Sequence, residues 1–295
     1  MADNHTRVKH FAAPPGGALS AAMVAAYGND GVLVLEGMFS RAQCAAMMAR
    51  AGELVDGFDP GANPTVFSTT TRRHDQDDYF AGSGGRIRFF LEAGAMAADG
   101  SLNRPATRCI NKIGHALHDL DPVFDEFSRD PKLAAVAKGL GCAQPLLLQS
   151  MYIFKQPGIG DEVVWHQDST FLYTEPMSVF GLWVALEDAT VENGCMWALP
   201  GRHGEGLRQR FRYVDGALST EILDPEPWPA SGKVPLEVPQ GSLVVLHGCL
   251  PHWSDSNLSD HSRHAYTLHV IDGACHYPGD NWLRRPADMP LRGFS

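Results

Sequence analysis

The chain has 295 residues and a formal net charge of -10 at pH 7, with 44% hydrophobic and 20% charged residues. This composition is typical of a globular protein, and the negative charge excludes a bulk electrostatic attraction to nucleic acid or to an anionic membrane. The six cysteines form no C-x-x-C pair, which argues against a zinc knuckle or a disulfide scaffold and fits a reducing compartment.

Targeting signals are not evident in the sequence. Residues 1–9 are polar and lack the apolar segment of a signal peptide, and the apolar runs along the chain are too short to span a bilayer. The last residues, Arg292-Gly-Phe-Ser295, do not match a peroxisomal Ser-Lys-Leu signal. We therefore expect a cytoplasmic protein without nucleic-acid or membrane partners, and we take a monomer as the default state.

The N-terminal half of the sequence mixes helical and extended patterns. Residues 1–17 end in Pro14-Pro-Gly-Gly17 and are predicted to be a disordered tail. Ser40 precedes a run rich in Ala, Met and Gln, so it is predicted to cap a helix. The elements expected before residue 144 are a helix at 18–27, a strand at 32–35, the helix that Ser40 caps to about residue 55, a long loop at 58–85, a strand at 86–91, and helices at 121–127 and 130–140.

After Gln144-Pro145 the sequence changes to short β-rich segments. They fall at 146–154, 163–166, 180–186, 196–199, 234–238, 243–247 and 266–271. Short strands separated by Pro and Gly are typical of a sandwich or barrel. We therefore predict a mainly β fold with flanking helices. In it, a double-stranded β-helix (jelly roll) is braced by N-terminal helices within one domain, residues 18–295.

The triplet His166-Gln-Asp168 carries the strongest chemical signal. Residues two apart on a strand point to the same face of a sheet, so the imidazole and the carboxylate are expected to lie together. Such a pair supplies two of the three ligands of a 2-His-1-carboxylate site, which leaves positions on Fe(II) open. The chain has 13 histidines, so this pair becomes informative only with a third ligand downstream.

The third ligand is expected between Gly241 and Arg263. His247 and His252 both compete for this role, and we favour His252. Ser254 would share its face if the segment is extended, and Arg263 opens the next strand-like run. A guanidinium suits the distal carboxylate of 2-oxoglutarate because its planar fork pairs bidentately with a carboxylate. The hydroxyl of Ser254 could add a further donor.

With these residues, the sequence resembles the phytanoyl-CoA dioxygenase family of Fe(II)/2-oxoglutarate oxygenases. The resemblance covers nearly the whole chain, roughly from Leu19 to Leu283. The segments that carry it are Asp30–Gly37, Arg86–Phe90, Ile110–His118, Gln149–Pro157, Phe171–Pro176, Glu187–Gly194 and Asn257–Asp260.

The resemblance implies a role for each matching residue. The implied iron ligands are His166, Asp168 and His252. The implied contacts to 2-oxoglutarate are Lys112, Met151, Trp183, Ser254 and Arg263. From the residues alone, Lys112 could instead extend from a strand edge, and Met151 and Trp183 could be core packing. The implied cofactors are Fe(II) and 2-oxoglutarate, with O₂ as the oxidant.

The activity that the resemblance implies is a dioxygenase. It would hydroxylate, or similarly oxidise, a small and partly apolar substrate with release of succinate and CO₂. Asp168 favours hydroxylation over halogenation, because related halogenases lack this carboxylate and bind halide in its place. Two other functions remain open: a non-catalytic sensor of 2-oxoglutarate or metal, and a metal-dependent hydrolase or isomerase on the same fold.

The substrate pocket is less well defined by the sequence. The residues expected to line it are Arg88, Phe90, Gln149, Trp165, Phe171, Tyr173 and Trp197. Arg88 could hold a substrate carboxylate or pair with Glu92, four residues away. Tyr152 and Phe154 lie on the opposite strand face from Met151 and are expected in the core.

Overall fold

The structure is a computed structural model of the chain, and it describes residues 7–61, 64–70 and 77–295. The helices are α1 (Ala21–Asp30), α2 (Arg41–Asp56), α3 (Asp78–Ala81), α4 (Leu117–Leu120), α5 (Pro122–Ser128) and α6 (Pro131–Gly139). The strands are β1 (His10–Ala12), β2 (Val32–Glu36), β3 (Val66–Phe67), β4 (Ile87–Glu92), β5 (Ile110–His115), β6 (Pro145–Ile153), β7 (Val163–His166), β8 (Phe180–Ala185), β9 (Met196–Ala198), β10 (Gln209–Val214), β11 (Ala217–Ile222), β12 (Val234–Leu236), β13 (Leu243–His247), β14 (His252–Ser254) and β15 (Ala265–Asp272).

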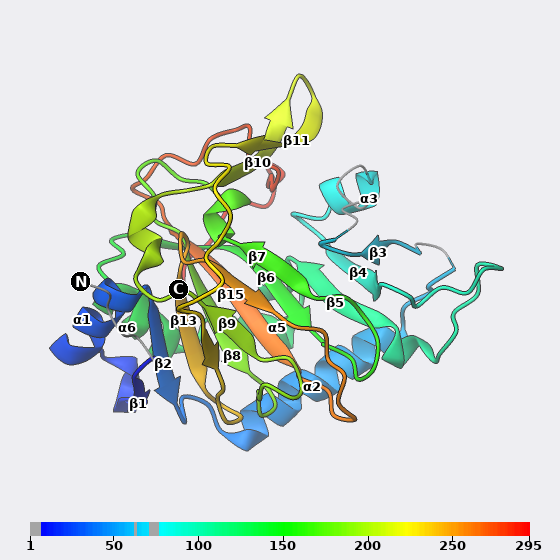
Figure 1. Cartoon of the computed structure of the whole chain (residues 1–295), viewed down its shortest axis with the longest axis horizontal. Coiled ribbons are helices and arrows are strands. Elements are labelled where there is room, and N and C mark those ends of the chain that lie inside the picture. Colours follow the sequence, from blue (N-terminus) through cyan, green and yellow to red (C-terminus); the bar gives the residue numbers. More distant parts are fainter. Residues whose placement is uncertain (1–6, 62–63, 71–76) are drawn as a thin grey trace.

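Two open sheets form the body of the molecule (Figure 1). Within the described residues, the larger sheet has nine strands in the order β1-β2-β13-β8-β15-β6-β5-β4-β3. The smaller sheet has four strands in the order β12-β9-β14-β7. The pairing is antiparallel except for β1 with β2 and β3 with β4. The hairpin β10–β11 projects beyond both sheets (Figure 1).

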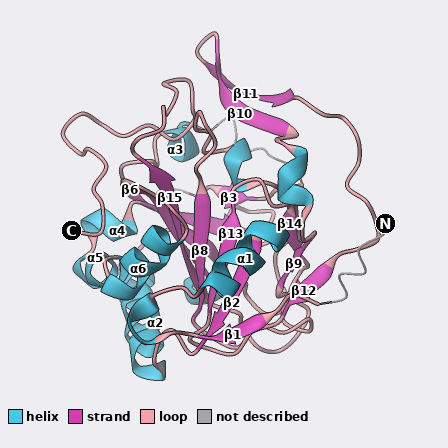
Figure 2. Cartoon of the chain, turned by 90° about the vertical axis from the view of Figure 1, so that its left-hand side faces the viewer, coloured by secondary structure: helices cyan, strands magenta, loops and turns pink. Residues whose placement is uncertain are grey.

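The larger sheet is buried on both faces, as β13 shows. Leu243 and Val245 pack into the core beneath the helices. Val244 and Leu246 point the opposite way and pack into a second core between the two sheets. This alternation follows from the two-residue period of a strand, and it explains why β13 is apolar at successive positions. Figure 2 shows α2, α5 and α6 on one side of the larger sheet, and β9, β12 and β14 on the other.

Helix α2 begins where the sequence predicts. Ser40 Oγ accepts a hydrogen bond from the backbone N–H of Gln43 at 3.2 Å, and Gln43 Oε1 accepts one from the backbone N–H of Ser40 at 3.0 Å. This reciprocal cap satisfies two donors at the helix terminus. The buried side chains Cys44, Met47, Ala51 and Val55 recur every three or four residues along the helix, so one face packs on the sheet. No helix among the described residues is long and apolar enough to cross a membrane.

The predicted architecture, a mainly β jelly-roll core with flanking helices, is confirmed, but several local predictions differ. Residues 10–17 were placed in a disordered tail, yet they form β1 and a 3-10 turn, because β1 adds a parallel strand to β2. The segment 58–85, predicted as a loop, contains β3 and α3. The hairpin β10–β11 was not predicted. Its turn, Asp215-Gly216, has positive φ at both residues, which is the usual signal for a two-residue hairpin.

Asp119 in α4 ties the C-terminal segment to the helical layer. Its Oδ1 accepts hydrogen bonds from Nη2 of Arg129 at 2.9 Å and Nη2 of Arg292 at 2.8 Å, and its Oδ2 accepts one from Arg285. Burial alone would raise the pKa of Asp119, but the attraction of His118 and Arg285 outweighs burial and lowers it. The carboxylate is therefore ionised at neutral pH.

We predict that Asp119→Asn lowers the free energy of unfolding by about 3 kcal/mol, because a buried carboxylate loses its charge while its cations remain. The folded-state pKa of Asp119 lies below its unfolded value. Its contribution is therefore complete above the ordinary Asp range and is lost as pH falls through the folded-state pKa. Urea unfolding followed by circular dichroism measures the change. The control is Asp56→Asn at the exposed end of α2, and equal stability of the two variants would contradict the prediction.

Candidate metal and cosubstrate site

Three predicted metal ligands meet at the junction of β7 and β14. His166 ends β7, Asp168 begins the 3-10 turn Asp168–Thr170, and His252 opens β14 directly opposite His166. Nε2 of His166 lies 3.8 Å from Asp168 Oδ1, and Nε2 of His252 lies 3.6 Å from the same oxygen. The candidate ligand atoms all lie within 4.8 Å of one another, which is close enough to share one ion.

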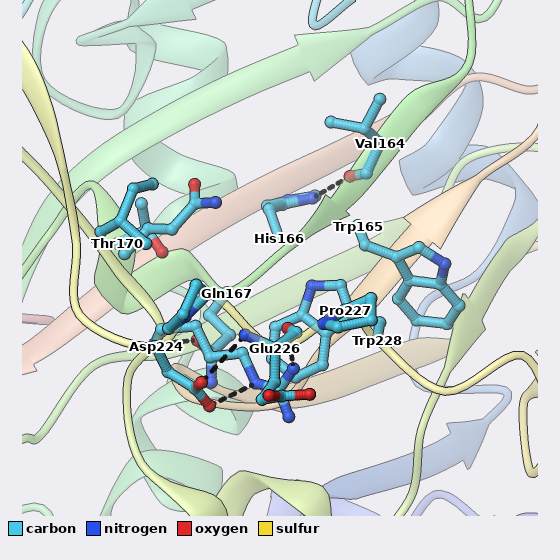
Figure 3. Close-up of a pocket in the computed structure, with 13 residues that line it drawn as sticks. Val164, Trp165, His166, Gln167, Thr170, Asp224, Glu226, Pro227 and Trp228 are labelled. Carbon is cyan, nitrogen blue, oxygen red and sulfur yellow. Dashed lines mark hydrogen bonds and ion pairs between the residues drawn. The ribbon is translucent and has the colours of Figure 1, made fainter.

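Both imidazole rings are oriented by backbone carbonyls. Nδ1 of His166 lies 2.9 Å from the carbonyl oxygen of Val164 (Figure 3), and Nδ1 of His252 lies 3.0 Å from that of Leu250. A carbonyl only accepts, so each Nδ1 carries the proton and each Nε2 keeps a free lone pair toward Asp168. Burial, and then the neighbouring His252, lower the pKa of His166 to about 3. The ring is therefore neutral at pH 7, as a metal ligand requires.

Asp168 is held by a residue that the sequence analysis did not single out. Nε2 of His269 on β15 lies 3.3 Å from Asp168 Oδ2, on the side away from the two ligand histidines. Burial would raise the pKa of Asp168, but the attraction of His269 and His252 outweighs burial and lowers it. Gly181 leaves room for this carboxylate oxygen, since a Cβ added there would lie 3.2 Å from Asp168 Oδ2. Oδ1 is thus left facing the ligand histidines.

His247, the other candidate for the third ligand, lies outside this cluster. Its Nδ1 accepts a hydrogen bond from the backbone N–H of Cys249 at 3.0 Å, and its ring centroid lies 4.9 Å from that of His203. Burial lowers its pKa to about 4, so the ring is neutral. The geometry supports His252 in the ligand role.

Arg263 reaches the same cavity from the segment just before β15. It is 2% exposed, and its Nε donates to the carbonyl of Gly194 at 3.2 Å. Burial lowers the pKa of the guanidinium to about 10, which leaves it charged at neutral pH. Within the described part of the chain, Nη1 of Arg263 is buried and has no hydrogen-bond partner. A buried charged donor without a partner is costly, so this atom fits the carboxylate of a ligand.

The other predicted cosubstrate contacts line the same inner cavity, which has a volume of about 200 Å³. Trp183 lies with its ring 5.4 Å from the Arg263 guanidinium. Nζ of Lys112 lies 3.0 Å from the ring centroid of Phe67. The remaining wall residues of this group are Met151 and Ser254. The structure therefore brings all five predicted contacts and all three predicted ligands to the wall of one cavity.

The predicted substrate residues are only partly brought together. Gln149 and Phe171 line the inner cavity. Trp165 lines a second, outer pocket of about 550 Å³ (Figure 3). This pocket shares Val164, His166, Thr170 and Gln209 with the inner one and therefore lies next to the metal side of the cavity.

Four of the predicted substrate residues line neither pocket, each for a packing reason. Arg88 stacks on the Tyr79 ring at 4.4 Å and donates to backbone carbonyls, and it makes no ion pair with Glu92. Phe90 is fully buried behind the cavity wall. Tyr173 lies under Arg210 at 4.3 Å, and Trp197 packs on Trp253 on the outer face of the smaller sheet. These interactions hold the four side chains away from both pockets.

Several lining residues were missed by the sequence analysis. On β15, Thr267 and His269 are polar residues two apart in an otherwise apolar strand, and this alternation is a signal that could have identified them. Phe211 comes from the hairpin and Trp282 from the C-terminal segment. No local pattern marks these two, because their place in the wall depends on how distant segments pack.

The fold and the site together define a non-haem iron, 2-oxoglutarate-dependent dioxygenase. Among solved structures, a non-heme alpha-ketoglutarate-dependent carbocyclase, SnoK from nogalamycin biosynthesis, is similar in fold. Its TM-score is 0.65 at 18% sequence identity, over 95% of this chain and 99% of that chain.

Sequence comparison gives the family. The model of the phytanoyl-CoA dioxygenase family matches residues 27–265, and the chain belongs to this family. It is 48% identical over 274 residues to phytanoyl-CoA dioxygenase 1 of Oryza sativa subsp. japonica, covering 92% of this chain and 96% of that protein. It is 45% identical over 284 residues to phytanoyl-CoA dioxygenase domain-containing protein 1 of Mus musculus, covering 92% and 97%.

We predict that His252→Ala weakens Co(II) or Fe(II) binding by more than about 100-fold, because losing a ligand costs more than losing a residue that only orients one. His247→Ala is the matched control and should bind metal like the unchanged chain. Titration of the metal-free protein under anaerobic conditions, followed by Co(II) absorption, measures both affinities. A loss of affinity in His247→Ala with retention in His252→Ala would reverse the assignment.

We predict that His269→Ala weakens Co(II) binding by about 10-fold, because the free Asp168 carboxylate can then turn away from the ligand histidines. His269→Gln keeps a donor and should recover part of the affinity, whereas His261→Ala, at an exposed position, should have no effect. The same titration measures these changes. Unaltered affinity and an unaltered Co(II) spectrum in His269→Ala would show that His269 does not orient Asp168.

Proposed function

We propose that this chain is an Fe(II)- and 2-oxoglutarate-dependent dioxygenase that hydroxylates, or similarly oxidises, a small and partly apolar molecule with release of succinate and CO₂. One observation carries the proposal. A buried His-Asp-His cluster and a buried guanidinium with an unpartnered Nη1 line the same cavity. Metal binding alone would not need the guanidinium, and its unpaired Nη1 lies where the carboxylate of a bound keto acid could accept from it.

The residues form two groups along the cavity. His166, Asp168 and His252, from the smaller sheet and its turn, would hold the iron. Arg263 and Ser254 would hold the distal carboxylate of 2-oxoglutarate. The bound iron supplies the activation of O₂, which no protein side chain provides. Asp168 occupies the position that a halide would need, which supports hydroxylation rather than halogenation.

Lys112, Met151 and Trp183 complete the cosubstrate region in this proposal. Trp183 supplies a flat wall beside Arg263, and Lys112 adds positive charge to the cavity wall. Together they would fix the orientation of the bound keto acid and exclude water from it. Enclosing the reacting groups in a dry cavity also suppresses side reactions.

The substrate region next to the metal cluster is lined mainly by apolar side chains. Its walls include Phe80, Phe171, Phe211 and Trp282, while Gln149 offers an amide. An enclosed space of this composition suits a small molecule with an apolar part and at least one polar group. The family relatives carry phytanoyl-CoA in their names, but the walls define only this broader class of substrate.

Each alternative function leaves some of the residues in the cavity without a role. A sensor of metal or 2-oxoglutarate would need the ligands but gains nothing from an adjacent apolar substrate region. A hydrolase or isomerase that uses another metal would leave Arg263 and Ser254 without a purpose. Activity that persists without O₂ would favour the hydrolase or isomerase.

The direct test is anaerobic addition of Fe(II) and then 2-oxoglutarate to the metal-free protein. We expect a visible charge-transfer band, followed by consumption of 2-oxoglutarate when O₂ is admitted. Arg263→Ala should weaken 2-oxoglutarate binding by about 100-fold, since a charge-assisted hydrogen bond to a buried ion is lost. Arg41→Ala, at an exposed position on α2, is the control. Absence of the band in the unchanged protein would reject the proposed function.

A further inference from the structure

Lys155 is a second buried cation beside Arg263. It follows the end of β6, is 5% exposed and lines the inner cavity together with Arg263 and Ser254. Its Nζ donates to Ser254 Oγ at 3.2 Å, and the carbonyl oxygen of Asp161 lies 3.4 Å away. Lysine is rarely buried to this extent without a charge partner.

The backbone of Lys155 is held in an unfavourable conformation. Its φ of 40° lies in the left-handed region, which non-glycine residues adopt rarely and mainly where the surrounding structure forces them to. The carbonyl of Lys155 accepts hydrogen bonds from the backbone N–H of Arg263 at 3.3 Å and from Nδ2 of Asn257 at 2.9 Å. These bonds tie the backbone of Lys155 to the segment that carries Arg263. The two side chains therefore start from fixed positions relative to each other.

Gly194 lies against both cations. A Cβ added at this residue would lie 3.0 Å from Cε of Lys155, and the carbonyl of Gly194 accepts the hydrogen bond from Nε of Arg263. Its φ of 80° also requires a glycine. The two long side chains therefore converge over one glycine rather than pointing into separate spaces.

Lys155 lies among charged groups of both signs. Burial and then Arg263 lower its pKa to about 7, while Glu92, Asp255 and Glu162 act in the opposite direction. An anion bound beside Nζ would favour the charged form of Lys155. Among the residues that the structure describes, none of these carboxylates forms an ion pair with Nζ. Two basic side chains thus border one cavity that has room for an anion.

We propose that Lys155 and Arg263 act as a two-cation clamp for the distal carboxylate of the keto acid, with Ser254 between them. The inference rests on the proposed function and adds a specificity residue to it. Because Ser254 Oγ accepts from Lys155, the hydroxyl proton of Ser254 is directed to another acceptor, and the carboxylate supplies one. Lys155 thereby selects a dicarboxylic keto acid over a monocarboxylic one of the same chain length.

The test compares two keto acids on Mn(II)-loaded protein by isothermal titration calorimetry, so no turnover is needed. The acids are 2-oxoglutarate and 2-oxopentanoate, which lacks the distal carboxylate. We expect Lys155→Met to weaken 2-oxoglutarate binding by about 10- to 100-fold and to leave 2-oxopentanoate binding nearly unchanged. Lys155→Arg should keep most of the preference. Lys138→Met, at an exposed position in α6, is the control.

The outcomes separate this inference from the proposed function. If Lys155→Met weakens the binding of both acids equally, or of neither, the clamp is overturned and Lys155 is a structural residue. If Lys155→Met does not fold, Lys155→Gln gives the same comparison without the charge, and the same loss of preference is expected. Failure of the unchanged chain to bind either acid would reject the proposed function, and the clamp with it.

Discussion

The site depends on the pairing of β14 with β7. This antiparallel contact sets His252 opposite His166, and the turn that follows His166 brings Asp168 back to them. The register shifts between His252 and Ser254, which is the effect of a β-bulge. Bulges re-aim side chains next to active sites. Here the shift accompanies the change from metal ligand to cosubstrate contact within three residues.

The two sheets face each other, and together they bring the metal ligands and the cosubstrate contacts to one cavity. The smaller sheet and the turn after β7 supply the metal ligands, while β15 of the larger sheet and the segment before it supply His269 and Arg263. Between them lies a cavity that contains more buried charge than a stable core would accept. The apolar layers on both sides of the larger sheet provide the stability that offsets this cost. Ligands that bind only the folded chain would stabilise it further.

Much of the fold and the site could be predicted from the sequence. The N-terminal cap at Ser40, the helix after it and most strands follow from local pattern, because propensity and burial agree there. His166 and Asp168 were paired on the assumption of a continuous strand, but Asp168 lies in a 3-10 turn. The prediction that they meet was right, although the turn rather than the pleat brings them together.

What could not be predicted depends on contacts between distant segments. Lys155 is one charged residue in a loop after β6. Only its packing on Gly194 and Arg263 shows that it borders the cosubstrate region. Arg88 and Phe90 line neither pocket because of such contacts. Phe90 pairs across β4–β5 with Lys112 and packs behind the wall. The sequence pattern predicts to which face of a strand a side chain points, but not which distant segment packs against that face.

The hairpin β10–β11 and the C-terminal segment supply Phe211 and Trp282 to the cavity, yet neither belongs to the sheets that hold the metal ligands. Selection can therefore reshape the substrate wall by altering these segments while the oxidising centre stays intact. Descendants of one ancestral enzyme could then diverge in what they oxidise without having to reinvent how they oxidise it. In this architecture the oxidation chemistry resides in the sheets and the choice of substrate resides in the segments around them.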